Sequence, residues 1–266
     1  MSVKHSRFDN LLRAVSLACL LTSISLWAVN AIAAPEEIQV YLDEFTESGQ
    51  YSLDVHTNYV GSARQNLAAS PVQTTDHQLR VTPEFSYGIN SNWDMAAYLL
   101  TINDGSGTVQ TDGVKVRAKW RPEVPSANSA WYWAVNFEVG QLSRRYYPDQ
   151  TSSEIKLISV WKTEPWVVGV NFNIDRSLKS NPIQGTTSEI DSKLAYTIRD
   201  GLQIGIENYA YRGEIHNNTN LPQSNQVTFL ATDFNLNKWD FNLGIGYATG
   251  QTPDRLLIKT IVGVPF

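Results

Sequence analysis

The sequence has very little cysteine. Its one cysteine, Cys19, lies in the apolar stretch 14–28, which follows three basic residues and precedes the small residues Ala31-Ile32-Ala33. This order is typical of a secretory signal peptide, so we expect residues 1–33 to be removed. The mature chain would then contain no thiol, which excludes disulfides, thiolate metal sites and a cysteine nucleophile.

Basic residues are also in deficit. The full chain has 21 basic and 26 acidic residues, for a net charge of −5. The expected signal peptide carries three of the basic residues and one aspartate, so the mature chain has 18 basic and 25 acidic residues, a net charge of −7. This balance argues against nucleic acid as a partner, because surfaces that bind nucleic acid are usually basic.

Long apolar runs are missing after residue 33. None approaches the roughly 20 residues of a membrane-spanning helix, so only strands could cross a membrane. The last twelve residues, 255–266, alternate between an apolar and a mixed face, which is the period of a strand. The terminal Phe266 resembles the assembly signal of bacterial outer-membrane barrels, which implies the barrel-assembly machinery as a partner. A periplasmic β-sandwich is the alternative interpretation.

The same alternation predicts eleven further strands, and an even total suits a closed barrel. Two segments are ambiguous in register. In 155–161, Ile158 and Val160 fall on the nominally polar face, and in 226–236 both faces are partly apolar. The expected strands are 51–59, 79–89, 93–101, 114–121, 131–142, 155–161, 166–173, 189–198, 202–207, 227–236, 239–247 and 255–266.

The connections between these strands alternate between long polar loops and mostly shorter turns. All seven tryptophans outside the signal peptide lie close to a short turn, where they would ring one rim of a barrel. Amphipathic rings favour the membrane interface, and unequal loops suit rims that face different compartments. We therefore predict an all-β fold over 49–266, a transmembrane up-and-down antiparallel β-barrel of about 12 strands in contact with outer-membrane lipid.

The fourth expected strand determines which face looks into the barrel. Four basic residues alternate with apolar ones there. A basic residue facing lipid near the midplane would cost roughly 2–4 kcal/mol, so all four are expected in the lumen. The lumenal candidates for solute selectivity are Arg80, Glu84, Lys115, Arg117, Lys119, Arg121, Glu138, Asp54 and His56.

The register that we expect for this strand gives carboxylate partners to Lys115, beside Glu138, and to Arg121. Arg117 and Lys119 have none on either flank in that register. Unpaired cations in a narrow, low-dielectric passage attract anions. The sequence therefore predicts a mild preference for anionic solutes.

Residues 34–48 precede the first strand and carry five carboxylates around the apolar residues of 38–42. We interpret them as an acidic N-terminal tail or a short lumenal plug. Barrels of eight strands fill with side chains and those of sixteen to eighteen leave a channel, so twelve should leave a narrow lumen. A short segment could occlude such a lumen, and its deletion should then raise conductance.

Candidate catalytic residues are few. Asp54 and His56 point inward from one expected strand and could form a base with its orienting carboxylate. No nucleophile is identifiable, and a hydrogen bond that packs the lumen is the interpretation we favour. His77 and His216 lie in separate loops without ligand spacing, so we expect no metal site and no cofactor.

Three stretches carry a family resemblance: IQVYLDE at 38–44, TPEFSYG at 82–88, and the block from Trp239 to Phe266. They resemble a proteobacterial outer-membrane family that is similar to the barrels named after the MetA pathway of phenol degradation. The resemblance spans most of the mature chain and implies the passage of small, often aromatic, molecules. It supplies no catalytic residue.

These observations favour a passive channel or small-solute transporter of the Gram-negative outer membrane. The expected partners are lipid, the assembly machinery and small solutes, anionic or aromatic. An outer-membrane enzyme with a lumenal or rim active site is the second interpretation, and a structural barrel is the third. The solute, the open radius and the oligomeric state stay open.

Overall fold

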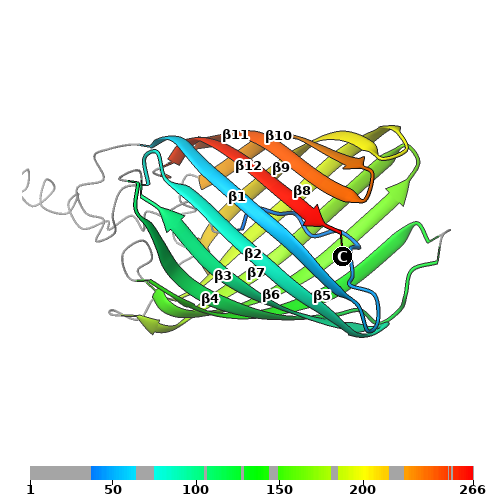
Figure 1. The fold of residues 1–266 in the computed structure, drawn as a ribbon, viewed down its shortest axis with the longest axis horizontal. Helices are drawn as coiled ribbons and strands as arrows, with labels where there is room; N and C mark the ends of the chain where they lie inside the picture. The colour runs from blue at the N-terminus through cyan, green and yellow to red at the C-terminus, as the bar shows by residue number, and fades with distance from the viewer. Residues whose placement is uncertain are drawn as a thin grey trace, which may run out of the picture. The chain divides into compact units, whose positions relative to one another are not determined.

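Twelve strands close into one barrel. The structure, a computed structural model, describes residues 37–265 except 64–74, 105–106, 127–128, 144–148, 181–184, 216–224, 251 and 253. Each strand pairs antiparallel with its sequence neighbours, and β1 pairs with β12 to close the sheet (Figure 1). The predicted closed antiparallel barrel is confirmed. The strands are β1 (Tyr51–Ala63), β2 (Leu79–Asn90), β3 (Trp93–Asn103), β4 (Val109–Trp120), β5 (Trp131–Leu142), β6 (Asp149–Thr163), β7 (Trp166–Ser180), β8 (Thr186–Arg199), β9 (Leu202–Glu214), β10 (Asn225–Leu236), β11 (Trp239–Thr249) and β12 (Asp254–Val264).

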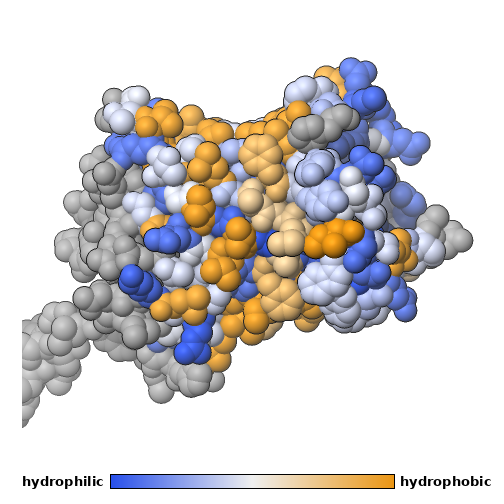
Figure 2. All heavy atoms as spheres, turned by 60° about the horizontal axis from the view of Figure 1, so that its bottom comes forward, coloured by the Kyte–Doolittle hydropathy of each residue, from blue (hydrophilic) through white to orange (hydrophobic). Residues whose placement is uncertain are grey.

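Side chains alternate between the lumen and the outer surface along each strand. On β5, Trp131 and Phe137 are exposed on the outside, whereas Asn136 and Glu138 are buried inside. Figure 2 shows the outward apolar side chains gathered across the middle of the surface, with polar residues toward both ends. No helix among the described residues is long and apolar enough to cross a membrane.

The two rims of the barrel differ. The rim at which β2 joins β3 and β10 joins β11 has mostly two-residue turns, apart from the 121–130 connection, and we call it the short-turn rim. Tryptophan rings gather there in mutual contact: the centroids of Trp93 and Trp120 lie 6.3 Å apart, and those of Trp120 and Trp133 lie 5.7 Å apart. All tryptophans in the described part of the chain lie near this rim, as expected: Trp93, Trp120, Trp131, Trp133, Trp161, Trp166 and Trp239.

The two ambiguous strands have defined registers. On β6, Ile158 and Val160 face the lumen and are fully buried, while Ile155 and Leu157 face outward. On β10, Phe229 and Ala231 are buried inside the barrel. Both strands therefore have apolar residues on each face, which is why their alternation is weak in the sequence.

The register predicted for β4 is wrong by two residues on both sides. Arg117 lies opposite Glu138 of β5, and Lys119 lies opposite Asp94 of β3. The connection from β4 to β5 spans 121–130, so no tight turn fixes their pairing. On the other side, the β3–β4 ladder shifts register between Leu100 and Thr101. A slip of two residues keeps every side chain on its own face, so the facing argument could not detect it.

Candidate functional site in the barrel lumen

A stretch of chain without regular structure lies inside the barrel. Residues 37–48, which we call the lumenal segment, pass through the lumen and reach the short-turn rim just before β1 (Figure 1). There, Ser48 forms an isolated parallel bridge with Gly88 of β2. Ile38, Val40 and Tyr41 of the segment are each less than 5% exposed. The predicted acidic tail thus lies within the barrel from residue 37 onward, whereas residues 1–36, with the expected signal peptide, lie outside the described residues.

Polar side chains of the wall bind the backbone of the lumenal segment. Asn171 of β7 accepts a hydrogen bond from the Tyr41 N–H (2.7 Å) and donates one to the Tyr41 carbonyl (2.9 Å). The Lys259 ammonium donates to the Ile38 carbonyl (3.1 Å), and the Lys119 ammonium donates to the Glu44 carbonyl (2.6 Å). A buried backbone outside helix or sheet must find such partners elsewhere, and here the wall supplies them.

Two apolar patches on the wall receive the apolar side chains of the segment. The first, which we call the β10 patch, consists of Val60, Tyr209, Phe229, Ala248 and Leu257 and packs against Ile38 and Val40. The second, which we call the β6 patch, consists of Tyr132, Ala134, Ile158, Val160, Val167 and Ala195 and packs against Tyr41 and Leu42. The inward apolar residues of β6 and β10 therefore face the segment rather than water.

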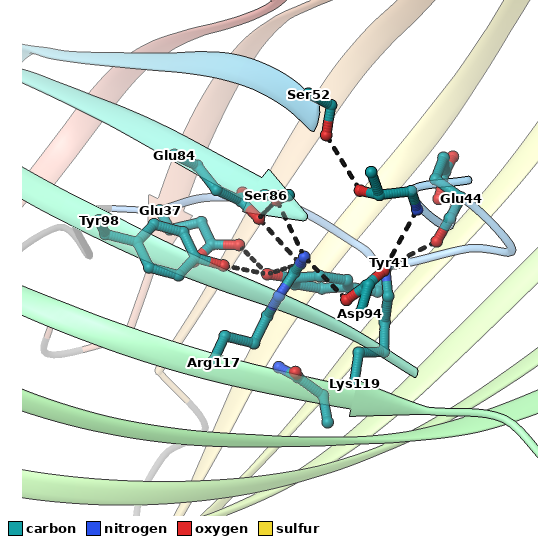
Figure 3. A network of polar contacts seen from close by, with 12 residues as sticks. Glu37, Tyr41, Glu44, Ser52, Glu84, Ser86, Asp94, Tyr98, Arg117 and Lys119 are labelled. Carbon is teal, nitrogen blue, oxygen red and sulfur yellow. Dashed lines mark hydrogen bonds and ion pairs between the residues drawn. The ribbon is translucent and has the colours of Figure 1, made fainter. Parts of the chain in front are cut away.

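A cluster of ion pairs lies on β2 to β4, between the strands that carry the two apolar patches (Figure 3). Arg117 pairs with Glu84 (2.9 Å) and with Asp94 (3.2 Å), and Lys119 pairs with the second oxygen of Asp94 (3.4 Å). Asp94 also accepts a hydrogen bond from the backbone N–H of Thr46. We call Glu84, Asp94, Arg117 and Lys119 the ionic cluster.

This cluster corrects the sequence interpretation. Arg117 and Lys119 were expected to have no carboxylate partner, yet both are paired and each is at most 5% exposed. The basis for the predicted anion preference is therefore wrong. The expected pair between Lys115 and Glu138 is present at 2.8 Å, although the two residues lie diagonally rather than directly opposite.

The remaining candidates take separate positions. His56 bonds Glu84 (3.1 Å) rather than Asp54, so Asp54 does not orient it as the carboxylate of a catalytic pair, the less favoured of the two interpretations. The Arg80 guanidinium donates to Gln78, and that of Arg121 lies 4.1 Å from the centre of the Phe45 ring. His77 lies exposed beside Tyr59 and Asp76. His216 and Phe266 lie outside the described residues.

A second group of ion pairs was missed in the sequence. Lys193 of β8 pairs with Glu207 (3.2 Å) and Asp233 (2.7 Å), and Lys259 of β12 also pairs with Glu207. Each residue occupies an inward position of its own strand, and Lys193 lies directly opposite Glu207 on the neighbouring strand β9. Lys259 reaches Glu207 across the lumen from β12, which is not a neighbour of β9.

An open space remains between these two ionic groups. A cavity of about 670 Å³, which we call the vestibule, extends from Asp240 and Pro265 at the short-turn rim to Lys193 and Lys259. The lumenal segment, including Val40, forms part of its wall. A smaller cavity of about 250 Å³ is lined by Leu42 and by residues of the short-turn rim.

Three possible metal-binding side chains meet where the lumenal segment passes β1 and β2. One ligand atom from each of Glu37, His56 and Glu84 lies within 4.8 Å of the other two. The Tyr41 hydroxyl donates a hydrogen bond to Glu37 and lies 3.1 Å from the Tyr98 hydroxyl. Burial raises the pKa of the Tyr41 phenol well above its usual range, so the hydroxyl stays protonated and able to donate.

Comparisons with known proteins place the chain by its fold. No family model and no curated protein matches the sequence. The KdgM porin is 12% identical, with 81% of this chain and 99% of that chain covered and a TM-score of 0.55. The translocator domain of the autotransporter NalP from Neisseria meningitidis is 14% identical, with 84% and 91% covered and a TM-score of 0.53. The NanC porin is 13% identical, with 80% and 98% covered and a TM-score of 0.50.

At this level of identity the likeness concerns the fold alone. The chain has the closed β-barrel fold of these porins and of the translocator domain. The resemblance to barrels named after the MetA pathway stays a prediction.

Proposed function

We propose that the protein is an outer-membrane channel for small solutes and that the lumenal segment closes it. The observation that carries this proposal is the position of residues 37–48, which lie in the lumen between walls that carry buried charges. A barrel meant only to fill its interior could do so with its own side chains, as eight-stranded barrels do. Here an added stretch of chain does the filling.

The outer surface supports a location in a bilayer. Large apolar side chains such as Phe85, Leu230 and Ile245 are more than half exposed. Water would disfavour so extensive an apolar surface, whereas the hydrocarbon region of a membrane would not. The tryptophans at the short-turn rim suit one membrane interface. We expect outer-membrane lipid and the barrel-assembly machinery to be the partners of this surface.

The lumenal segment could leave without disturbing the sheet. Only the bridge between Ser48 and Gly88 joins it to the strand ladder in the described part of the chain, and all twelve strand pairings are made without it. The segment is therefore a removable occupant rather than a part of the barrel. Its release would join the vestibule to the space that the segment now fills.

The side chains that line the lumen give only partial information about which solutes would pass. Because the basic residues of the ionic cluster are paired, they give no reason to favour anions. The resemblance to barrels that are presumed to pass aromatic molecules keeps small aromatic solutes in the set to be tested. We propose small polar or aromatic solutes with no strong selection by charge.

The geometry gives little support to the enzyme interpretation. His56 Nε2 bonds Glu84 and Nδ1 has no partner, so within the described part of the chain no hydroxyl is placed for activation by His56. A general base without a nucleophile or a positioned water lacks the arrangement that acyl transfer requires. We therefore propose no catalytic role.

The test is conductance in planar bilayers. The refolded mature protein is compared with a variant in which residues 37–47 are replaced by a Gly/Ser sequence of equal length. We expect a higher single-channel conductance for the variant, with the heat-dependent gel shift of a folded barrel in both proteins. Failure of both proteins to conduct would contradict the channel. Equal conductance would retain the channel but contradict closure by the segment.

A further inference from the structure

We infer that Glu37, His56 and Glu84 form a divalent metal site that fastens the lumenal segment to the barrel wall. The three side chains come from three separate parts of the chain: the segment, β1 and β2. One imidazole and two carboxylates are a ligand set for a first-row transition ion such as Zn²⁺, with water completing the coordination. The functional reading of this site rests on the proposed closure, but the binding itself does not.

The spacing of the ligand atoms suits such an ion. His56 Nε2 and Glu84 Oε2 lie 3.1 Å apart. Two ligands about 2.0–2.2 Å from a tetrahedral ion are separated by roughly 3.3 Å, so this pair already approximates one edge of the coordination shell. All three ligand atoms lie within 4.8 Å of one another. Glu37 would therefore have to approach by roughly 1.5 Å at most, a shift that its irregular backbone allows.

Neighbouring groups hold the two carboxylates in position. The Tyr41 hydroxyl donates to Oε1 of Glu37. Arg117 (2.9 Å) and the Ser86 hydroxyl (3.1 Å) donate to Oε1 of Glu84, which leaves Oε2 toward His56. Hydrogen bonds of this kind orient the ligands of known metal sites. His56 itself is 1% exposed, and its Nδ1 atom has no hydrogen-bond partner in the structure.

The local charge also favours a divalent cation. Glu37 and Glu84 at the site, Asp54 directly across from Glu84, and Asp94 bound to Arg117 carry four negative charges. Two positive charges face them, on Arg117 and Lys119, while Lys115 and Lys156 have their own carboxylates, Glu138 and Glu154. The carboxylates around the site therefore outnumber the cations that face them. A proton on His56 or a bound divalent ion would offset this excess.

A metal at this position would connect the segment to β2, a strand that its apolar contacts do not reach. Ile38 and Val40 pack on the β10 patch, whereas Glu84 lies on β2 in the ionic cluster. The ion would thus hold residue 37 against β1 and β2, and its removal would loosen this N-terminal end of the segment. The metal site would in this way hold the lumenal segment in the closed position.

The experiment measures Zn²⁺ binding by the refolded mature protein in detergent, by competition with a chromophoric chelator. We expect one ion per chain, and a loss of affinity of at least about tenfold in Glu37→Gln and in His56→Gln, since each removes a ligand. His77→Gln is the matched control, because His77 is exposed and, among the described residues, belongs to no comparable group of ligands. Co²⁺ in place of Zn²⁺ should give visible absorption bands that both ligand variants lose.

Several results would overturn the inference. The absence of stoichiometric binding would exclude the site, and unchanged affinity in His56→Gln would place the ion elsewhere. Unchanged affinity in Glu37→Gln would show that the segment does not take part. The gel shift establishes folding of each variant, and Glu37 lies outside the strands, so its replacement keeps the test valid should His56→Gln fail to fold. Because binding is measured without conductance, a failed channel assay and a failed metal site are distinguishable.

Discussion

The β10 patch and the ionic cluster hold the same segment in different ways. The patch buries Ile38 and Val40 among apolar side chains, a contact whose strength depends on area and little on direction. The ionic cluster binds the segment through polar contacts, whose strength depends on distance and angle. Lys119 donates to the Glu44 carbonyl and lies over the Tyr41 ring, and Asp94 accepts a hydrogen bond from the Thr46 N–H. The comparison suggests a division of roles: apolar burial keeps the segment in the lumen, and polar contacts fix its position along the barrel.

The two regions should also respond differently to substitution. Removing an apolar contact from the segment leaves the barrel intact, because no strand depends on it. Removing a member of the ionic cluster leaves buried charges without partners in the wall itself, which destabilises the barrel. The predictions below test this difference.

The largest effect is expected from the double substitution Ile38→Asp, Val40→Asp. It places two carboxylates against Phe229 and Leu257, and an unpaired buried charge costs several kcal/mol. The segment should leave the lumen, and conductance should rise to that of the Gly/Ser replacement. Gln39→Asp is the control, because Gln39 is only half-buried, whereas Ile38 and Val40 are buried among apolar side chains. A double variant that conducts like the wild type would show that burial on the β10 patch does not hold the segment.

Asp94→Asn should produce the next largest effect, and on the barrel rather than on the segment alone. Asp94 is fully buried and contacts both Arg117 and Lys119. Breaking a buried pair of this kind typically costs about 3–5 kcal/mol, because the remaining charges stay buried. The urea midpoint of the refolded protein in detergent, followed by tryptophan fluorescence, should fall markedly. Asp200→Asn, in an exposed turn, is the control, and an equal midpoint in the two variants would contradict the role of the cluster.

The sequence predicts the fold well because a barrel has a strict two-residue period. Because lipid surrounds the barrel and the lumen is polar, the side chains of Lys115 and Glu138 must point inward, and both do so as predicted. The partners of Arg117 were wrong because a slip of two residues satisfies the same rule. Register therefore required the three-dimensional structure.

The lumenal site was predictable only in part. The inward Ile158 and Phe229 were visible as breaks in the alternation, and such breaks indicate an apolar partner inside the barrel. The meeting of Glu37 with His56 and Glu84 left no such signal, because it depends on the path of an irregular segment. Periodicity carries no information about such a path.

Gly88→Ala should displace the segment at its exit. A Cβ atom on Gly88 would lie 2.1 Å from the Glu47 carbonyl oxygen and 2.5 Å from that of Thr46, and backbone must move to relieve both contacts. Gly169→Ala should do less, because its Cβ would meet the flexible end of Leu42 at 2.4 Å. With an Ile38→Cys reporter in both variants, which leaves Leu42 in place, maleimide labelling of this buried position should be faster for Gly88→Ala. Equal rates would show that the bridge at Ser48 does not position the segment.

The smallest effect is expected where a charged pair of the segment lies near water. Asp43 pairs with Lys162, but the Lys162 side chain is 43% exposed and that of Asp43 is 27% exposed. Pairs of this kind contribute about 0–1 kcal/mol, because water solvates the charges nearly as well when they are apart. Asp43→Asn should therefore leave the urea midpoint and the conductance close to those of the wild type. A shift as large as that of Asp94→Asn would show that Asp43 is as important to the closed lumen as the buried ionic cluster, and the contrast between the two regions would fail.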